Sequence, residues 1–319
     1  MKRTVAMILT LMMLFSLCAC GQSAPAAAPA AQAEEAASEA SRLEQLQAAA
    51  ENGDAEAMAE LAWMYLNGTD VPQDLEQALA YGLKAAEAGN VEAQLELGKR
   101  YLTGEDVEQD DAKALQWLAA AAEGGSDEAM NAIMQTAYAY WDNDDFDNVR
   151  VWMEKAAELG NGDAMSDLGD LCVELGGDDA KAVEWYEKAS EAGSSYGDLN
   201  LGICYEFGYG VSQDFAKAKE YYEKAVDAGN TSAMLNLGAM YANGHGIKRD
   251  MEEAARLTRM AAEAGDAQAM TNLGRMLYYG DGVETNYEES LEWFQKAAAL
   301  GNEEAESWIK TAEAKVNKG

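Results

Sequence analysis

Histidine is the residue that catalytic triads and metal sites most often use, and this chain of 319 residues has one. It is His245, enclosed between Gly244 and Gly246. A general base needs a nucleophile within hydrogen-bond reach, and a zinc site needs three or four ligands. The sequence offers no such set around His245, which is therefore interpreted as an ordinary turn residue. We expect no enzyme activity, no catalytic residue, no cofactor and no metal site.

Acidic side chains are the other candidates for chemistry. Asn143, Asp145 and Asp147, with Glu154 in the twelfth place, superficially match a calcium-binding EF-hand loop. Asn148 stands where that loop needs a glycine, so calcium binding is not expected. Pairs of carboxylates can hydrolyse glycosidic bonds, but nothing singles out one pair among 57 Asp and Glu.

The net charge of −34 limits the choice of partners. Nucleic acids and anionic lipid head groups repel such a polyanion, so nucleic-acid binding is excluded. Two interpretations of the charge remain. It indicates either a well-solvated outer surface or an attraction to basic partners.

The first 19 residues are typical of a bacterial lipoprotein signal peptide. Lys2 and Arg3 precede an apolar run of 13 residues, Val5 to Leu17, which is too short for a membrane-spanning helix. The run ends in Leu-Cys-Ala-Cys, which resembles a lipobox and predicts that Cys20 is lipidated. An ordinary secretory peptide cleaved nearby is the alternative. Acyl chains on Cys20 would hold the protein on the extracytoplasmic face of a bacterial cell membrane.

A glycine recurs along the rest of the chain with steps of 36, 36, 35, 33, 36, 36 and 36 residues. The residue that follows is always a good helix N-cap, so each glycine is expected to end one helix just before the next begins. The eight pairs are Gly53-Asp54, Gly89-Asn90, Gly125-Ser126, Gly160-Asn161, Gly193-Ser194, Gly229-Asn230, Gly265-Asp266 and Gly301-Asn302.

A second turn divides most of the units into a first helix, helix A, and a second helix, helix B. Gly, or an Asp that tolerates the left-handed conformation, reverses the chain there, and a Val or Ile is expected to cover the helix ends. These turns begin at Gly68, Gly104, Gly208, Gly244 and Gly280, and Asp74, Asp110, Asp214, Asp250 and Asn286 are the predicted N-caps of helix B.

Helix A carries a leucine followed by a small residue, which lets helix B approach closely. The leucines are Leu61, Leu97, Leu168, Leu201, Leu237 and Leu273. Helix B carries alanines (Ala78, Ala114, Ala182, Ala218, Ala254) and then aromatic residues that we expect to lie in the core (Tyr81, Trp117, Trp152, Trp185, Tyr221, Trp293).

The sequence resembles the Sel-one-like repeat, a relative of the tetratricopeptide repeat. The resemblance rests on the run from Ala-x-x-x-Leu-Gly-x-x-Tyr through Gly-x-Gly-Val to Lys-Ala-Ala-Glu-x-Gly-Asn and covers residues 41–319. It implies an all-α, right-handed superhelical solenoid that serves as an interaction scaffold. With a capping helix at each end, seven helix pairs give 16 helices.

The predicted domains are a signal peptide over 1–19, a lipidated cysteine with a flexible Ala- and Pro-rich tether over 20–40, and the solenoid over 41–319. The repeats are expected at about 53–88, 89–124, 125–159, 160–192, 193–228, 229–264 and 265–300, with a C-terminal cap over 301–319. Two repeats depart from the pattern. Repeat three has Trp141-Asp-Asn-Asp-Asp-Phe146 in place of the glycine turn, and repeat four is three residues shorter around residues 175–179.

Cys172 and Cys204 lie late in helices A of adjacent repeats. A cysteine-rich branch of the resembled family pairs two cysteines within each repeat, and some of its members are reported to bind penicillin or hydrolyse β-lactams. This chain lacks that spacing, so the activity is not carried over. Two buried free thiols are favoured, and a disulfide between them remains the alternative.

One helix-A position, just before the leucine, is the candidate partner-binding site. It holds Glu60, Glu96, Asp167, Asn200, Asn236 and Asn272. Helix A of such solenoids lines the concave groove, and an asparagine amide can both donate to and accept from a peptide bond. A partner with basic character at one end would suit the acidic first half of this row.

The sequence therefore favours a monomeric, membrane-anchored scaffold that binds a peptide or protein partner in its concave groove. The alternative is an envelope hydrolase acting on peptidoglycan or β-lactams, but no nucleophile–base pair supports it. A solute-binding lipoprotein is a third candidate, and the absence of any strand pattern argues against its two-lobed α/β fold.

Overall fold

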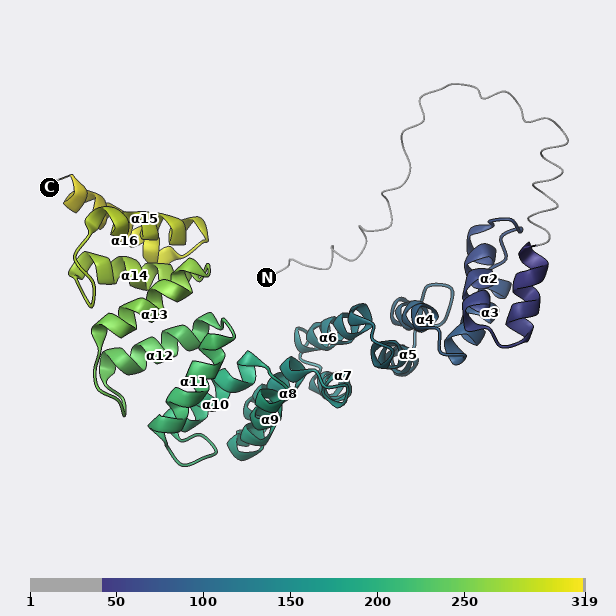
Figure 1. Cartoon of the computed structure of the whole chain (residues 1–319), viewed down its shortest axis with the longest axis horizontal. Coiled ribbons are helices and arrows are strands. Elements are labelled where there is room, and N and C mark those ends of the chain that lie inside the picture. Colours follow the sequence, from purple (N-terminus) through teal and green to yellow (C-terminus); the bar gives the residue numbers. More distant parts are fainter. Residues whose placement is uncertain (1–41, 318–319) are drawn as a thin grey trace, which may run out of the picture.

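The computed structural model describes residues 42–317, and all of its regular structure there is helical. The predictions for Cys20, the signal peptide and the tether concern residues outside this described range. Sixteen helices follow one another along a curved, elongated path, with the N-terminal and C-terminal repeats at opposite ends (Figure 1). The all-α superhelical repeat fold is thus confirmed. None of the helices in residues 42–317 is both long and apolar enough to cross a membrane.

The first helix covers residues 42–51 and caps the N-terminal end. Helices A are α2 (Ala55–Asn67), α4 (Val91–Thr103), α6 (Asp127–Trp141), α8 (Gly162–Gly176), α10 (Ser195–Phe207), α12 (Thr231–Asn243) and α14 (Ala267–Tyr279). Helices B are α3 (Leu75–Glu87), α5 (Asp111–Glu123), α7 (Phe146–Glu158), α9 (Asp179–Glu191), α11 (Phe215–Asp227), α13 (Met251–Glu263) and α15 (Tyr287–Ala299). The capping helix α16 (Glu303–Val316) lies within the predicted C-terminal cap over 301–319.

The turns between repeats form as the sequence predicts. All eight recurring glycines have φ between 84° and 100°, the region that side chains disfavour. The residue after each glycine caps the next helix, because its side-chain oxygen accepts from a backbone N–H two or three residues on. Only three residues therefore separate the end of one helix from the start of the next, which fixes the stacking of successive repeats.

Inside each repeat, the predicted leucines of helix A and alanines of helix B are buried as expected. Two of the predicted helix-B aromatics, Trp152 and Trp293, are buried, and the other four pack against the core at its edge. Tyr81, Trp117, Trp185 and Tyr221 are only half-buried, whereas the next residues in three of those repeats (Leu118, Tyr186, Tyr222) are buried. The physical reason is helical geometry: the residue four positions after the buried alanine turns to one side of it and the residue three positions after turns to the other side, which here lies at the edge of the core.

The half-buried aromatics instead carry lysines on their outer faces. Lys188 lies 4.0 Å from the ring centre of Trp185, and Lys224 lies 4.6 Å from that of Tyr221. A cation over an aromatic face is attracted by the ring quadrupole. These lysines therefore cover apolar surface at the outside of helix B.

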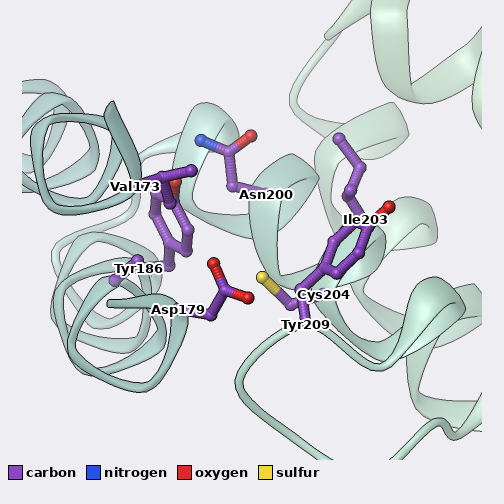
Figure 2. Close-up of a pocket in the computed structure, with 8 residues that line it drawn as sticks. Val173, Asp179, Tyr186, Asn200, Ile203, Cys204 and Tyr209 are labelled. Atoms are coloured by element: carbon purple, nitrogen blue, oxygen red, sulfur yellow. The ribbon is translucent and has the colours of Figure 1, made fainter. Parts of the chain in front are cut away.

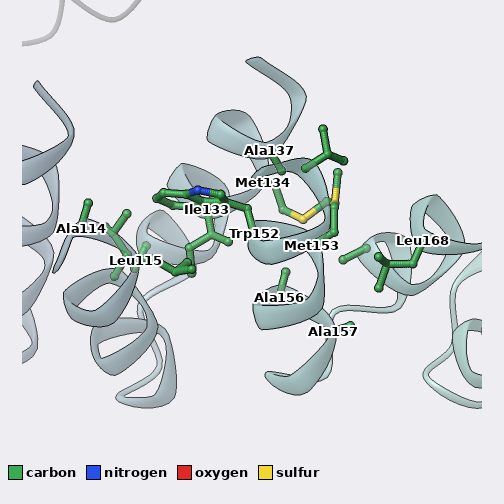
Figure 3. Packing of buried hydrophobic residues seen from close by; sticks show 14 of the residues in the cluster. Ala114, Leu115, Ile133, Met134, Ala137, Trp152, Met153, Ala156, Ala157 and Leu168 are labelled. Carbon is green, nitrogen blue, oxygen red and sulfur yellow. The ribbon is translucent and has the colours of Figure 1, made fainter. Parts of the chain in front are cut away.

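Repeat three closes without a glycine turn. Asp144 takes the left-handed conformation with φ 58°, and Trp141 meets Phe146 edge to face with ring centres 6.2 Å apart. Beneath them Trp152 and Ile133 belong to one buried cluster that joins repeats two to four (Figure 3). Helices α6 and α7 still pack as a pair, because the rings of Trp141 and Phe146 take the place of the Val or Ile that covers the helix ends in the other turns.

Candidate binding surface

The six predicted binding residues are all half-buried, and two of them, Asp167 and Asn200, contact the helix A of the preceding repeat. In α10, the Asn200 Nδ2 donates to Ser166 Oγ and to Asp170 Oδ1, each at 3.2 Å, and both partners lie on α8. In α8, Asp167 Oδ2 accepts from the Tyr138 hydroxyl of α6 at 2.8 Å. Asp167 and Asn200 thus link neighbouring repeats in addition to offering polar atoms to a partner.

The acidic members of the row in repeats one and two have cationic partners from the chain itself. Glu60 pairs with Arg42 of the N-terminal helix. Glu96 pairs with Arg100 one turn later, at 3.0 Å. Each arginine also pairs with a second carboxylate, Arg42 with Asp70 and Arg100 with Asp106, so the negative charge of these repeats is only partly compensated. The attraction of a basic group to the first repeats stays a prediction.

Asp167 differs because no salt bridge reaches it among the described residues. Burial raises the pKa of its carboxyl to about 6, and Asp170 and Asp163 on the same helix add repulsion. The Tyr138 hydroxyl opposes this by donating to the carboxylate. An ionised Asp167 carboxylate therefore lowers the stability of the fold at the junction of repeats three and four.

The two remaining asparagines are less constrained. Asn272 Oδ1 accepts from Gln268 Nε2 on the same helix at 3.2 Å. Asn236 lies beside the hydroxyl of Tyr222. That hydroxyl donates to Glu206 at 2.8 Å. The asparagine row as a ligand contact stays a prediction.

A cavity of about 160 Å³ opens beside Asn200, between α8, α9, α10 and the turn that follows α10. Val173, Ala182, Ile203 and Tyr209 supply most of its apolar wall. Figure 2 shows the Asp179 carboxylate and the Cys204 sulfur in the middle of this space, with the Asn200 amide at its edge. The cavity was not predicted from the sequence. The signal that could have indicated it is the three-residue shortening of repeat four around residues 175–179.

The remaining chemical candidates lie apart from one another. Cys172 and Cys204 are free thiols, and burial raises the pKa of Cys204 to about 11, so it is a poor nucleophile at neutral pH. His245 Nδ1 lies 3.2 Å from Oε1 of the buried Glu206, which ties one turn to the preceding repeat. Asp145 caps α7, so the segment resembling an EF-hand is the start of a helix. Within residues 42–317 no three His, Cys, Asp or Glu residues gather as a metal site would require.

The sequence pattern of the Sel1 repeat matches seven segments of the chain: 55–90, 91–126, 150–161, 162–194, 195–230, 231–266 and 267–302. The chain belongs to the Sel1 repeat family. Repeat three matches over its last residues only, which agrees with its aromatic closure. Sel1 repeat proteins generally mediate protein–protein interactions, and their scaffold is typically non-catalytic.

Two solved structures of Sel1 repeat proteins resemble this one. A Sel1 repeat protein from Oxalobacter formigenes is 28% identical with a TM-score of 0.62, and the match covers 84% of this chain and 79% of that one. A protective antigen of uropathogenic Escherichia coli strains, which displays the same repeat fold, is 32% identical with a TM-score of 0.50. That match covers 84% of this chain and 50% of the E. coli protein, so this chain spans half the length of that relative. None of the curated proteins matches the chain.

Proposed function

We propose that this Sel1 repeat protein is a lipid-anchored, extracytoplasmic scaffold that binds a peptide or protein partner along the row of helix-A positions from Glu60 to Asn272. Asp167 is the observation that carries the proposal. Its carboxylate is half-buried without a cationic partner, next to Tyr138, which is 44% exposed. Proteins keep such a costly charge where it serves binding, and a basic group of a partner would compensate it.

The asparagines extend the same surface into the C-terminal repeats. Asn200, Asn236 and Asn272 stand one per repeat on α10, α12 and α14. Each amide can donate to a peptide carbonyl or accept from a peptide N–H. Because one such hydrogen bond contributes only about 0.5–1.5 kcal/mol, the three must act together to hold a partner.

The binding test compares two triple variants of the full-length chain in its own membrane. A photo-crosslinking amino acid beside Asn236 would first trap the partner, and mass spectrometry would identify it. Changing Asn200, Asn236 and Asn272 to Ala should weaken the purified complex at least tenfold while leaving the helical circular dichroism unchanged. The control changes three exposed helix-A asparagines, Asn67, Asn131 and Asn243, to Ala. Equal affinities for the two triple variants would refute the proposal.

The anchor is tested separately. Cys20→Ala should release the protein from the membrane fraction or leave it as an unprocessed precursor, because no acyl chain could then be attached. Cys172→Ala is the matched control and should fractionate like the unmodified chain. Membrane retention with normal processing of the Cys20 variant would argue against lipidation there.

A further inference from the structure

In five of the seven repeats, one aliphatic side chain of the turn between helices A and B covers the ends of both helices; we call it the closing residue. The closing residues are Val71, Val107, Val211, Ile247 and Val283, and all are buried or half-buried. Val71 belongs to the hydrophobic core, and Val211, Ile247 and Val283 pack against it. In repeat three Trp141 and Phe146 do the same with their rings.

Repeat four has no closing residue. Helix α8 ends at Gly176, and only Gly177 and Asp178 separate it from α9. The space in which a Cβ of Gly176 or Gly177 would stand is empty to 4 Å. The cavity lined by Val173, Ala182 and Ile203 lies beside this shortened turn, because two of its lining residues, Val173 and Asp179, stand on either side of the turn.

The next repeat keeps the cavity open on its other side. The turn after α10 is held against the start of α9, since a Cβ at Gly210 would stand 2.3 Å from the Asp179 carbonyl oxygen. Tyr209 in that turn stacks on Phe207 with ring centres 5.8 Å apart. Both rings are about half exposed, so this wall is held by the contact between them and by the close approach of Gly210 to α9.

The surroundings of the cavity are acidic. The Asp179 carboxylate lies in the cavity wall. Asn200 also lines the cavity, and its Nδ2 donates a hydrogen bond to the carboxylate of Asp170. No acidic residue of α8 forms a salt bridge among the described residues. The Asn200 Oδ1 accepts no hydrogen bond within residues 42–317, and the amide lies at the edge of the cavity (Figure 2).

We propose that this cavity receives one Val, Ile or Leu side chain of an extended partner segment that carries Lys or Arg beside it. The partner thus supplies in repeat four the residue that the other repeats supply for themselves. The backbone N–H of that residue donates to Asn200 Oδ1, and the neighbouring cations face Asp179 and Asp170. This inference rests on the proposed function and names one contact within it.

The volume and the walls suit this occupant. A cavity of about 150 Å³ lined by aliphatic side chains holds a molecule as large as benzene, so about 160 Å³ is enough for a leucine side chain. Three apolar walls favour an aliphatic group, and the carboxylates favour a cation next to it.

The test uses isoleucine methyl groups, because the chain has only five isoleucines. Ile203 lines the cavity, whereas Ile133, Ile247 and Ile309 lie in repeats three and six and in the C-terminal helix. The full-length chain, labelled at its isoleucine δ1 methyls, would be titrated with the tripeptide acetyl-Lys-Leu-Lys-amide and followed by NMR. We expect the Ile203 signal to shift and saturate while the signals of the other three stay fixed.

Two matched tripeptides and two variants make the result specific. Replacing the central Leu by Ala should weaken binding roughly tenfold, because most of the buried apolar area is lost. Replacing both Lys by Glu should abolish the shift, and Asp179→Asn should weaken binding of the Lys peptide. Replacing residues 173–177 by the chain's own segment 206–213 restores the closing Val, so this variant should fold and show no shift.

No saturating shift of Ile203, or equal shifts with the Leu and Ala tripeptides, would overturn the inference. Shifts that survive the restored closing Val would do the same. Failure of the cavity proposal is distinguishable from failure of the scaffold proposal. If the tripeptide does not bind, the asparagine row can still hold the partner, and the triple asparagine variant would then weaken the complex. If the tripeptide binds but the triple asparagine variant keeps its full affinity for the partner, the scaffold proposal fails instead.

Discussion

Gly202 of α10 lies directly against the ring of Tyr222 of α11, so closely that a Cβ built on the glycine would stand 2.4 Å from two ring carbons. Gly98, Gly169 and Gly274 meet Leu118, Tyr186 and Phe294 in the same way. Gly238 differs, because Thr258 takes the place of the large side chain and the nearest atom is the Ala254 carbonyl oxygen at 3.4 Å. The glycine that follows the leucine is therefore required in four repeats and dispensable in repeat six.

This difference predicts opposite effects for two identical substitutions. Gly202→Ala should destabilise the protein by about 1–3 kcal/mol, because Tyr222 is buried and cannot move aside. Gly238→Ala should be neutral or stabilising by about 0.5–1 kcal/mol, since Ala is the better helix former. Urea unfolding followed by circular dichroism measures both. Equal midpoints for the two variants would contradict the packing difference.

Gly282 tests how successive repeats dock. A Cβ on this glycine would stand 1.9 Å from the Met251 carbonyl oxygen of the preceding repeat, and its φ is 72°. Gly282→Ala should therefore cost more than about 2 kcal/mol, as it adds overpacking to backbone strain. Gly265→Ala is the control, because that glycine also has positive φ (100°) but has no neighbour within 4 Å. Thermal melting of both should show the larger decrease for Gly282→Ala.

Asp167 should make the protein less stable as the pH rises. Because its pKa is raised from 3.8 to about 6, the folded state binds its proton more tightly than the unfolded state. Between about pH 4 and pH 6 the folded state thus holds more protons, and stability falls with increasing pH. Asp167→Asn should match the unmodified chain below pH 4 and exceed it by about 1–2 kcal/mol at pH 7.

Glu96→Gln is the control for this pH dependence, since it occupies the same repeat position but has Arg100 as a partner. It should bring no gain in stability at pH 7. Chemical unfolding at several pH values measures both variants. A pH profile of Asp167→Asn parallel to that of the unmodified chain would show that this carboxyl does not cause the fall.

Two tyrosine hydroxyls test the effect of burial on a carboxylate acceptor. The Tyr222 hydroxyl donates to Glu206 at 2.8 Å, and Glu206 is 6% exposed. Tyr222→Phe should cost about 1–3 kcal/mol, because a buried acceptor loses a donor that water cannot replace. The Tyr186 hydroxyl donates to Asp170 at 2.6 Å, but Asp170 is exposed, so Tyr186→Phe should cost less. Chemical unfolding should give the lower midpoint for Tyr222→Phe, and the reverse order would contradict the effect of burial.

The sequence by itself determined the helices, their caps and their order. The recurring glycine with its capping neighbour acts within a few residues, so its period reveals the turns without any knowledge of packing. The bounds of α16 and the left-handed glycines follow from this local chemistry. The leucines and alanines of the inner faces follow as well, because each helix has a fixed period of 3.6 residues.

Only the tertiary structure decided which side chains meet between helices. The rings that pack on the glycines, the pairing of Glu60 with Arg42 and the isolation of Asp167 all depend on contacts between separate helices. The cavity of repeat four has the same origin. The sequence shows that repeat four has no closing residue, but neighbouring side chains can either fill the space beside the shortened turn or leave it open. The turn that carries Tyr209 approaches the start of α9 closely at Gly210, and Tyr209 lines the cavity without filling it.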